Sequence, residues 1–295
     1  MTVNERLLSN ATLVNNALEA ALADGDPDFE EELAAERYAL LAPRAKRIRP
    51  TLVLECARIL GGRDEAALPF AVALEMIHTY SLIHDDLPAM DNDDLRRGRP
   101  TCHKAFGEAT AILAGDALLT RAFGVAAGNP AVTKESALAA VCALSRAAGP
   151  FGMIGGQVMD LSGEKKKLPL PSLLKLHAHK TGALMRVGAT LGALAAGYFP
   201  QDKETRALES YAEKTGLVFQ IVDDILDATE SAEELGKSAG SDAENGKTTF
   251  LSYYETDAAL RYAREVSEDA KREIRELPGS AFLLSLADSL LDRKF

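Results

Sequence analysis

The sequence has 295 residues, of which 47% are hydrophobic, so it can bury the core of one large domain or two ordinary ones. With 33 basic and 44 acidic residues the net charge is −11, which argues against nucleic acid as the main partner. Three cysteines without metal-type spacing (Cys56, Cys102 and Cys142) indicate reduced thiols, and we expect a cytoplasmic protein.

Apolar residues recur at spacings of three and four along nearly the whole chain, which predicts an all-α protein. The first expected helices lie in NERLLSNATLVNNALEAAL, FEEELAAERYALL and PTLVLECARIL. Longer helices are expected at 66–87, 107–127, 132–148, 171–197, 203–229 and 249–274, with a terminal one in FLLSLADSLLDRKF. No alternating β-branched run indicates a strand. No uninterrupted apolar run approaches the ~18 residues of a membrane span, so we expect no stable membrane anchoring.

One segment, TGALMRVGATLGALAAG, is apolar nearly all round, which is typical of a helix at the centre of a large bundle. Polar insertions at 162–171 and 228–247 separate helices, but no Pro- or Ser-rich linker and no repeat divides the chain. We therefore predict a single domain over residues 1–295, built as one large helical bundle.

The segment GLVFQIVDDILDAT places four polar residues on one helical face, at spacings of three or four: Gln220, Asp223, Asp224 and Asp227. Their neighbours are Leu, Val, Phe and Ile, and burying each carboxylate there would cost several kcal/mol. A solvated acidic edge is the simpler alternative. A divalent cation with oxygen ligands accounts better for the pattern.

The segment IHDDLPAMDNDDLRRGRP contains a second acidic cluster. Asp85 and Asp86 end an apolar helix, and the break at Pro88 lets Asp91 curl back toward the same metal. The arginines that follow, Arg96, Arg97 and Arg99, could simply neutralise these carboxylates. However, two acidic clusters lie about 130 residues apart, and guanidinium groups suit phosphate. We therefore expect magnesium to bridge the carboxylates to a diphosphate substrate.

Both segments, with HKTGAL and the stretch TCHKAFGEATAILAGDALL between them, resemble the signature segments of trans-isoprenyl diphosphate synthases. The resemblance is to the bacterial short-chain branch, the farnesyl diphosphate synthases. It implies one polyprenyl synthetase domain, an all-α bundle with a central cavity, usually a homodimer. The implied activity joins isopentenyl diphosphate to dimethylallyl or geranyl diphosphate to give farnesyl diphosphate (C15). The alternatives are a geranylgeranyl diphosphate (C20) synthase, a noncatalytic synthase subunit and a class I terpene cyclase.

The resemblance also implies a role for individual residues. Magnesium would be bound by the two acidic motifs, which comprise Asp85, Asp86, Asp91, Asp223, Asp224 and Asp227. The allylic diphosphate would be held by Arg96, Lys180 and Lys247, with help from Lys237. Isopentenyl diphosphate would be held by Lys46, Arg49, His78 and Arg97. Thr181 and Gln220 would face the reacting allyl group, and the released diphosphate would take the proton.

Three positions need separate weighing. The family usually has two glycines before the lysine of GGKRLRP, whereas here Arg44-Ala45 precede Lys46, which restricts the loop. Taken alone, His78 would be a core histidine. Glu75 and His78 together form the E-x-x-H pattern of di-iron sites, but such a site needs two copies of the pattern and this sequence has one. Tyr80 lies five residues before Asp85, ~7.5 Å deeper along the helix. It could be a core tyrosine, but the resemblance implies that an aromatic residue here forms the bottom of the product pocket and favours a C15 product. Ser81 offers no block.

Overall fold

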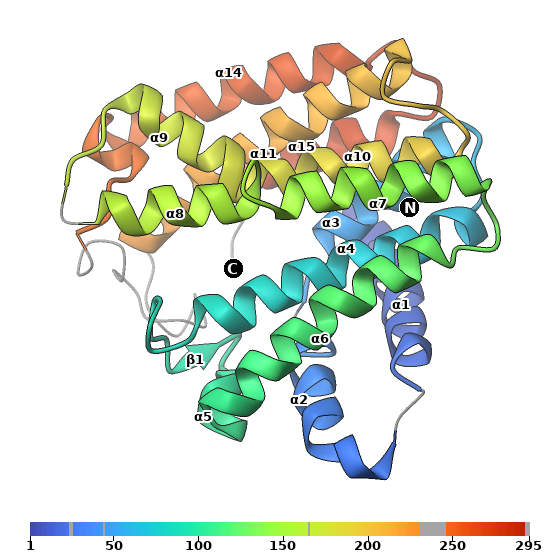
Figure 1. Cartoon of the computed structure of the whole chain (residues 1–295). Coiled ribbons are helices and arrows are strands. Elements are labelled where there is room, and N and C mark those ends of the chain that lie inside the picture. Colours follow the sequence, from blue (N-terminus) through green and yellow to red (C-terminus); the bar gives the residue numbers. More distant parts are fainter. Residues whose placement is uncertain (24–25, 44, 165, 230–245, 293–295) are drawn as a thin grey trace.

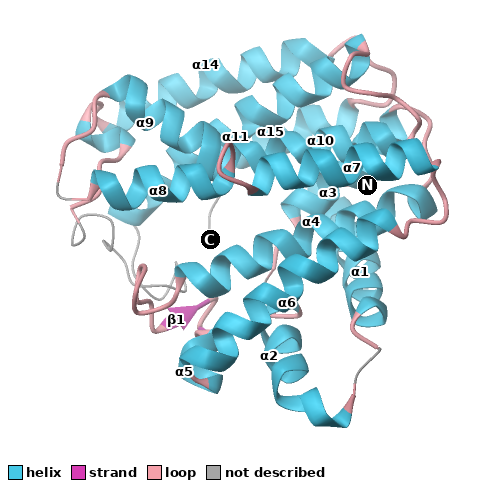
Figure 2. Cartoon of the chain, viewed as in Figure 1, coloured by secondary structure: helices cyan, strands magenta, loops and turns pink. Residues whose placement is uncertain are grey.

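The computed structural model describes residues 1–23, 26–43, 45–164, 166–229 and 246–292, and these are almost entirely helical (Figure 2). The helices are α1 (Val3–Ala21), α2 (Glu30–Leu40), α3 (Ile48–Ile59), α4 (Asp64–Asp85), α5 (Cys102–Phe106), α6 (Glu108–Ala127), α7 (Lys134–Ala148), α8 (Met153–Gly163), α9 (Leu170–His177), α10 (Ala183–Ala195), α11 (Lys203–Thr229), α14 (Thr256–Ile274) and α15 (Ala281–Leu291). Shorter elements are η1 (Pro27–Phe29), the π turn η2 (Ala178–Gly182), η3 (Phe250–Ser252), β1 (Leu95–Arg96) and β2 (Arg99–Pro100). The predicted all-α class is confirmed.

Helix α10 lies in the middle of the bundle, where it packs against α3, α4, α7 and α11 (Figure 1). Ten of its 13 residues are buried. Small residues allow the close approach: a Cβ added at Gly192 would lie 2.5 Å from the carbonyl oxygen of Val53 on α3. The central helix predicted from its apolar circumference is therefore confirmed.

The hydrophobic core continues on both sides of α10. On one side, α4 is buried among α1, α2, α6 and α7. On the other side, α11 packs against α14 and α15, and η3 closes the end of that layer. Each large apolar side chain buried in these clusters stabilises the fold by ~1.5–3 kcal/mol. This packing holds the ends of α4 and α11, where the acidic motifs lie, in fixed positions.

Several elements differ from the expected ones. The expected helix at 171–197 is interrupted by the π turn η2, and π turns are frequent at functional sites. The expected helix at 249–274 begins only at Thr256, after η3. Helix α8 was not expected, because the glycine pair in MIGGQVMD lowers helix propensity.

A two-stranded hairpin at 95–100 was also not expected, because strands of two residues are too short to show alternation. Its turn is made by Arg97 and Gly98, which both have positive φ, 55° and 74°. This is the backbone geometry that two-residue hairpin turns favour. In Figure 1 the hairpin lies near the carboxyl end of α4, below α8.

Among the described residues, three segments are long and apolar enough to cross a membrane by length and composition alone: Asp64–Asp85, Glu108–Ala127 and Lys134–Gly163. The search of the sequence for an uninterrupted apolar run did not identify these segments, because a few charged residues interrupt each of them. The first is 72% buried in the bundle, whereas the other two are 33% buried. The second and third segments carry seven exposed large hydrophobic residues, namely Ile112, Leu113, Leu138, Phe151, Ile154, Val158 and Leu161.

Candidate active site

The carboxyl end of α4 brings two aspartates together. Helix α4 ends at Asp85, and after the break at Pro88 the amide of Asp91 donates to the carbonyl oxygen of Asp85 at 2.9 Å. Asp91 therefore returns to Asp85, as the position of the proline predicts. Burial raises the pKa of the Asp85 carboxyl, and the nearby negative charge of Asp91 adds to that effect. Two partly desolvated carboxylates at one point favour a bound cation.

The hairpin gives Asp86 a different partner. Arg96 Nε donates to Asp86 Oδ1 at 3.0 Å, its Nη2 also contacts Asp86, and Asp93 lies 3.3 Å from the same guanidinium. Burial nonetheless raises the pKa of Asp86 to about 6. Arg96 therefore neutralises Asp86, which is the structural role that the sequence left open for these arginines. The metal-binding role of Asp86 and the diphosphate-binding role of Arg96 stay predictions.

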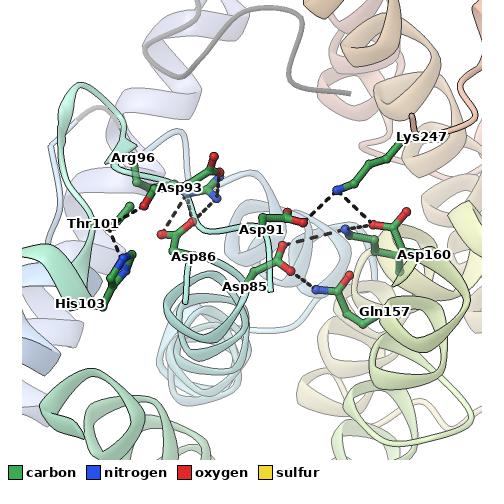
Figure 3. A network of polar contacts seen from close by, with 11 residues as sticks. Asp85, Asp86, Asp91, Asp93, Arg96, Thr101, His103, Gln157, Asp160 and Lys247 are labelled. Atoms are coloured by element: carbon green, nitrogen blue, oxygen red, sulfur yellow. Dashed lines mark hydrogen bonds and ion pairs between the residues drawn. The ribbon is translucent and has the colours of Figure 1, made fainter. Parts of the chain in front are cut away.

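Opposite Asp85 and Asp91 lie residues of α8, η2 and the segment after α11 (Figure 3). Lys247 Nζ is 2.9 Å from Asp91 Oδ1, and Lys180 Nζ is 3.9 Å from Asp85 Oδ2. The structure thus brings both expected lysines to the first acidic motif. Lys237 lies outside the described residues.

Sequence reasoning missed two residues of α8 at this site. The amide of Gln157 donates to Asp85, and Asp160 Oδ2 lies 2.6 Å from Lys180 Nζ. Burial opposes the charge of Asp160, but Lys180 and Lys247 hold the pKa of this carboxyl below its usual value. In the sequence, these two residues could have been found as a glutamine and an aspartate three positions apart in an otherwise apolar segment.

The second acidic motif, on α11, is joined to η2 by hydrogen bonds. Thr181 Oγ1 donates to Gln220 Oε1 at 3.1 Å, and Gln220 Nε2 donates to Asp224 Oδ1 at 3.0 Å. The amide of Phe250 donates to Asp224 Oδ2 at 2.9 Å. Asp224 therefore fixes the orientation of Gln220. Because Thr181 uses its proton for Gln220, its oxygen lone pairs can face a positive charge.

The other aspartates of this motif differ in exposure. Asp227 is buried and Asp223 is partly buried. Burial lowers the pKa of the Arg49 guanidinium, and the negative charge of Asp223 partly offsets this effect, so α11 faces the first basic motif. The metal-binding roles of Asp223, Asp224 and Asp227 stay predictions.

Basic residues gather beside α4, two turns before Asp85. Arg49 Nη1 lies 3.3 Å from His78 Nε2, so the histidine accepts a hydrogen bond as a neutral imidazole. Burial first, and the charge of Arg49 next, lower the pKa of His78 well below 6.5. Burial lowers the pKa of Arg49 to about 10, and the charge of Arg97 contributes. Arg49 therefore keeps its charge at neutral pH. Lys46, three residues before Arg49, is exposed.

The loop that lacks the glycine pair is anchored by Arg47. This residue has left-handed backbone geometry, with φ 51°, and its side chain is almost fully buried. Its guanidinium pairs with Glu75 on α4 and donates to the carbonyl of Leu40 and, at 2.9 Å, to Asn15 Oδ1. The side chains of Asn15 and Glu75 and the backbone carbonyl of Leu40, on three helices, thus hold the turn without glycine. Burial lowers the pKa of Arg49 and Arg97, and the negative charge of the same Glu75 partly offsets this effect, so Glu75 is a counter-charge for these two arginines as well.

The residues present fit an open magnesium site better than a closed cage. Within the described ranges no group of three or more His, Cys, Asp or Glu side chains could hold a metal ion. Magnesium usually binds through one or two carboxylates together with substrate phosphate oxygens and water. Asp85 and Asp91 offer such a pair, and Lys180 and Lys247 lie where they can meet the phosphates.

Comparison with known proteins agrees with this geometry. Residues 30–277 match the family described as Polyprenyl synthetase. The chain belongs to this family. It is therefore a prenyltransferase, and the recognised family and its all-α isoprenyl synthase fold are confirmed.

Three relatives illustrate the range of the family. The chain is 46% identical to farnesyl diphosphate synthase of Escherichia coli, covering 84% of this chain and 83% of that one. It is 42% identical to geranylgeranyl pyrophosphate synthase 7 of Arabidopsis thaliana, covering 98% and 83%. Among solved structures, the Helicobacter pylori geranyltransferase complexed with magnesium and isoprenyl diphosphate is 31% identical, with a TM-score of 0.84 and coverage of 97% and 95%. Relatives with C15 and C20 names are thus about equally similar.

Proposed function

We propose that this prenyltransferase is a magnesium-dependent farnesyl diphosphate synthase. It condenses isopentenyl diphosphate with dimethylallyl or geranyl diphosphate and releases diphosphate. The observation that carries the proposal is the arrangement along α4. Asp85 and Asp91 meet Lys180 and Lys247 at its carboxyl end, and Tyr80 lies ~7.5 Å deeper by helical rise.

The residues account for each step of the condensation. When the C–O bond of the allylic diphosphate breaks, the leaving diphosphate takes the bonding electrons. Lys180 and Lys247 stabilise the negative charge that the diphosphate gains. Bound magnesium would supply Lewis-acid stabilisation to the same leaving group. Thr181 and Gln220 direct oxygen dipoles at the allylic cation.

Isopentenyl diphosphate, held beside Arg49 and His78, then attacks that cation with its double bond. A new C–C bond forms, and the released diphosphate takes the proton that the isopentenyl unit loses. Because His78 is held neutral beside Arg49, it can donate one hydrogen bond to a phosphate without adding charge.

Tyr80 supports the C15 product. Its side chain is 5% exposed and meets the ring of His84 edge-on, with centroids 5.7 Å apart. His84 Nε2 in turn lies 3.1 Å from the carbonyl oxygen of Ile112 on α6, so the histidine that contacts the Tyr80 ring is itself held by a second helix. Burial raises the pKa of its phenol to about 12, which keeps the ring neutral. The rival product is the C20 geranylgeranyl diphosphate, for which the Arabidopsis relative is named. Its synthesis would use the same residues.

Transfer of label from isopentenyl diphosphate tests the reaction class. The purified protein is incubated with labelled isopentenyl diphosphate and dimethylallyl diphosphate, with Mg²⁺ or with EDTA. The proposal requires label in longer allylic diphosphates only with Mg²⁺. Label with EDTA present would contradict the metal requirement. Conversion of farnesyl diphosphate to hydrocarbon without isopentenyl diphosphate would favour a cyclase instead.

We also propose a homodimer. The segment from α6 to α8 carries seven exposed large hydrophobic residues, and exposed apolar residues that gather into a patch commonly mark protein–protein interfaces. A second copy of the chain is the occupant expected from the resemblance to the family. Sedimentation at micromolar concentration should give twice the chain mass of 31.5 kDa. A single-chain mass would contradict the proposal.

A further inference from the structure

Asp160 on α8 lies between two lysines. Its Oδ2 is 2.6 Å from Lys180 Nζ and 3.6 Å from Lys247 Nζ. Each lysine also reaches the first acidic motif: Lys247 contacts Asp91 at 2.9 Å, and Lys180 lies 3.9 Å from Asp85. Among the contacts of the described residues, Asp160 is therefore a carboxylate that both lysines share.

The charges in this group nearly cancel. Three carboxylates (Asp85, Asp91 and Asp160) meet two ammonium groups, which leaves one negative charge. Asp91 and Asp85, the pair that fits magnesium, thus already have cations beside them. A metal ion arriving alone must either displace an ammonium group or bind next to it, and like charges at a few ångströms repel strongly outside bulk water.

We propose that Asp160 is a positioning residue and that Lys180 and Lys247 are exchangeable counter-ions. Without substrate, the two lysines neutralise the carboxylates of the first motif. A diphosphate draws the ammonium groups onto its own oxygens, and Asp85 and Asp91 become available to the metal. Asp160 keeps both lysines within reach of either partner. The inference rests on the proposed function, because it assigns an order to events at the same site.

The exchange predicts that metal and diphosphate bind cooperatively. Diphosphate tightens metal binding, and the metal tightens diphosphate binding by the same factor. Removing a lysine should weaken this coupling in a distinctive way, since metal alone should bind more tightly while diphosphate binds less tightly. A lysine that only contacts phosphate would not affect the binding of metal alone.

The test counts free Mn²⁺ by electron paramagnetic resonance during titration of the purified enzyme, with and without inorganic diphosphate. For Lys247→Met we expect Mn²⁺ alone to bind about tenfold more tightly, the size of a typical coupling between sites. Lys166→Met is the matched control. Lys166 is exposed, and its carbonyl accepts a 3.0 Å hydrogen bond from Thr248, next to Lys247. That variant loses the same charge nearby and should bind Mn²⁺ as the wild type does.

Should Lys247→Met fail to fold, Lys180→Met removes the other ammonium group and gives the same readout. An Mn²⁺ affinity that is unchanged in the folded variant overturns the inference while the proposed function stands. A wild-type enzyme that binds no Mn²⁺ even with diphosphate overturns the proposed function, and this inference with it.

Asp160→Asn tests the positioning role itself. With diphosphate present, the number of bound Mn²⁺ ions should equal that of the wild type, while the affinity for diphosphate falls about tenfold. Asp160→Glu should recover part of that loss, because it restores a shared carboxylate. Loss of one bound Mn²⁺ ion in Asp160→Asn would show that Asp160 ligates the metal and would overturn the proposal.

Discussion

The backbone of Gly156 on α8 lies against the backbone of Lys180 in η2. A Cβ added at Gly156 would come within 2.3 Å of the Lys180 amide nitrogen and 2.6 Å of its Cα. Rotation of a side chain cannot relieve such a contact, so α8 and η2 can approach this closely only with glycine at 156. The contact sets Gln157 and Asp160 beside the residues that η2 contributes to the site.

Gly156→Ala should therefore lower kcat. The added methyl group separates α8 from η2, and a misplacement of about 1 Å at a catalytic group can reduce the rate by about a hundredfold. Gly124→Ala on α6 is the control, because a Cβ there meets nothing within 4 Å. Steady-state kinetics of both variants would check this. A Gly156→Ala enzyme with the wild-type kcat would mean that α8 does not position the site.

Tyr80→Ala should lengthen the products. Removing the buried ring leaves a cavity that a longer product chain could enter, and this cavity should lower the free energy of unfolding by about 3 kcal/mol. Ser81→Ala is the control, since Ser81 donates to the carbonyl oxygen of His78 within its own helix. We expect C20 products from Tyr80→Ala and unchanged products from Ser81→Ala. If mass spectra show the same product chain lengths for the two variants, Tyr80 does not form the bottom of the product pocket.

Glu75→Gln should weaken the binding of isopentenyl diphosphate more than that of the allylic substrate. The change removes the counter-charge of Arg47, which holds the loop before Arg49. It should also lower the free energy of unfolding by about 3–5 kcal/mol, the usual effect of breaking a buried ion pair. The measurement is KM for each substrate in turn.

Glu55→Gln is the matched control for this prediction. Glu55 is similarly buried but pairs with Arg6 on α1 and Arg58 on α3, away from Arg47. This variant should lose stability without a change in either KM. Equal changes in both KM values for Glu75→Gln would indicate a general loss of structure rather than a role in the basic loop.

His177 should make stability depend on pH. Burial lowers the pKa of His177 from 6.5 to about 4, so the folded protein holds it neutral. The resulting stability is fully present above pH 6.5 and is lost as the pH falls toward 4. At about 1.4 kcal/mol per pKa unit, the loss is about 3 kcal/mol. Urea unfolding at pH 7 and pH 4.5 should show a smaller decrease for His177→Phe than for the wild type. An equal decrease in both would contradict this burial effect.

The general fold could be predicted from the sequence because helical periodicity is a local property. The break at Pro88 also sufficed to predict that Asp91 returns to Asp85. The sequence raised the possibility that the arginines neutralise the carboxylates, but it could not show that Arg96 pairs with Asp86, since that pairing depends on a hairpin of two-residue strands. The role of Glu75 could not be found either, because its partner Arg47 comes from a loop 28 residues away.

Helix α8 shows the same limit for the site itself. Its glycine pair reads as a helix breaker, yet Gly156 is needed for contact with η2. Gln157 and Asp160 become recognisable only when the fold brings them to Asp85 and Lys180. Reasoning from motifs finds residues that lie in known patterns, whereas residues that orient those motifs are found through contacts between distant helices.

The most direct test of the central claim is the length of the product. The purified enzyme is incubated with Mg²⁺, isopentenyl diphosphate and geranyl diphosphate, with an EDTA control, and the products are identified by mass spectrometry. The account predicts farnesyl diphosphate, C15, as the metal-dependent end product. A C20 end product would contradict the proposal that Tyr80 forms the bottom of the product pocket and transfer length control to other residues, and no elongation in any mixture would contradict the proposed function as a whole.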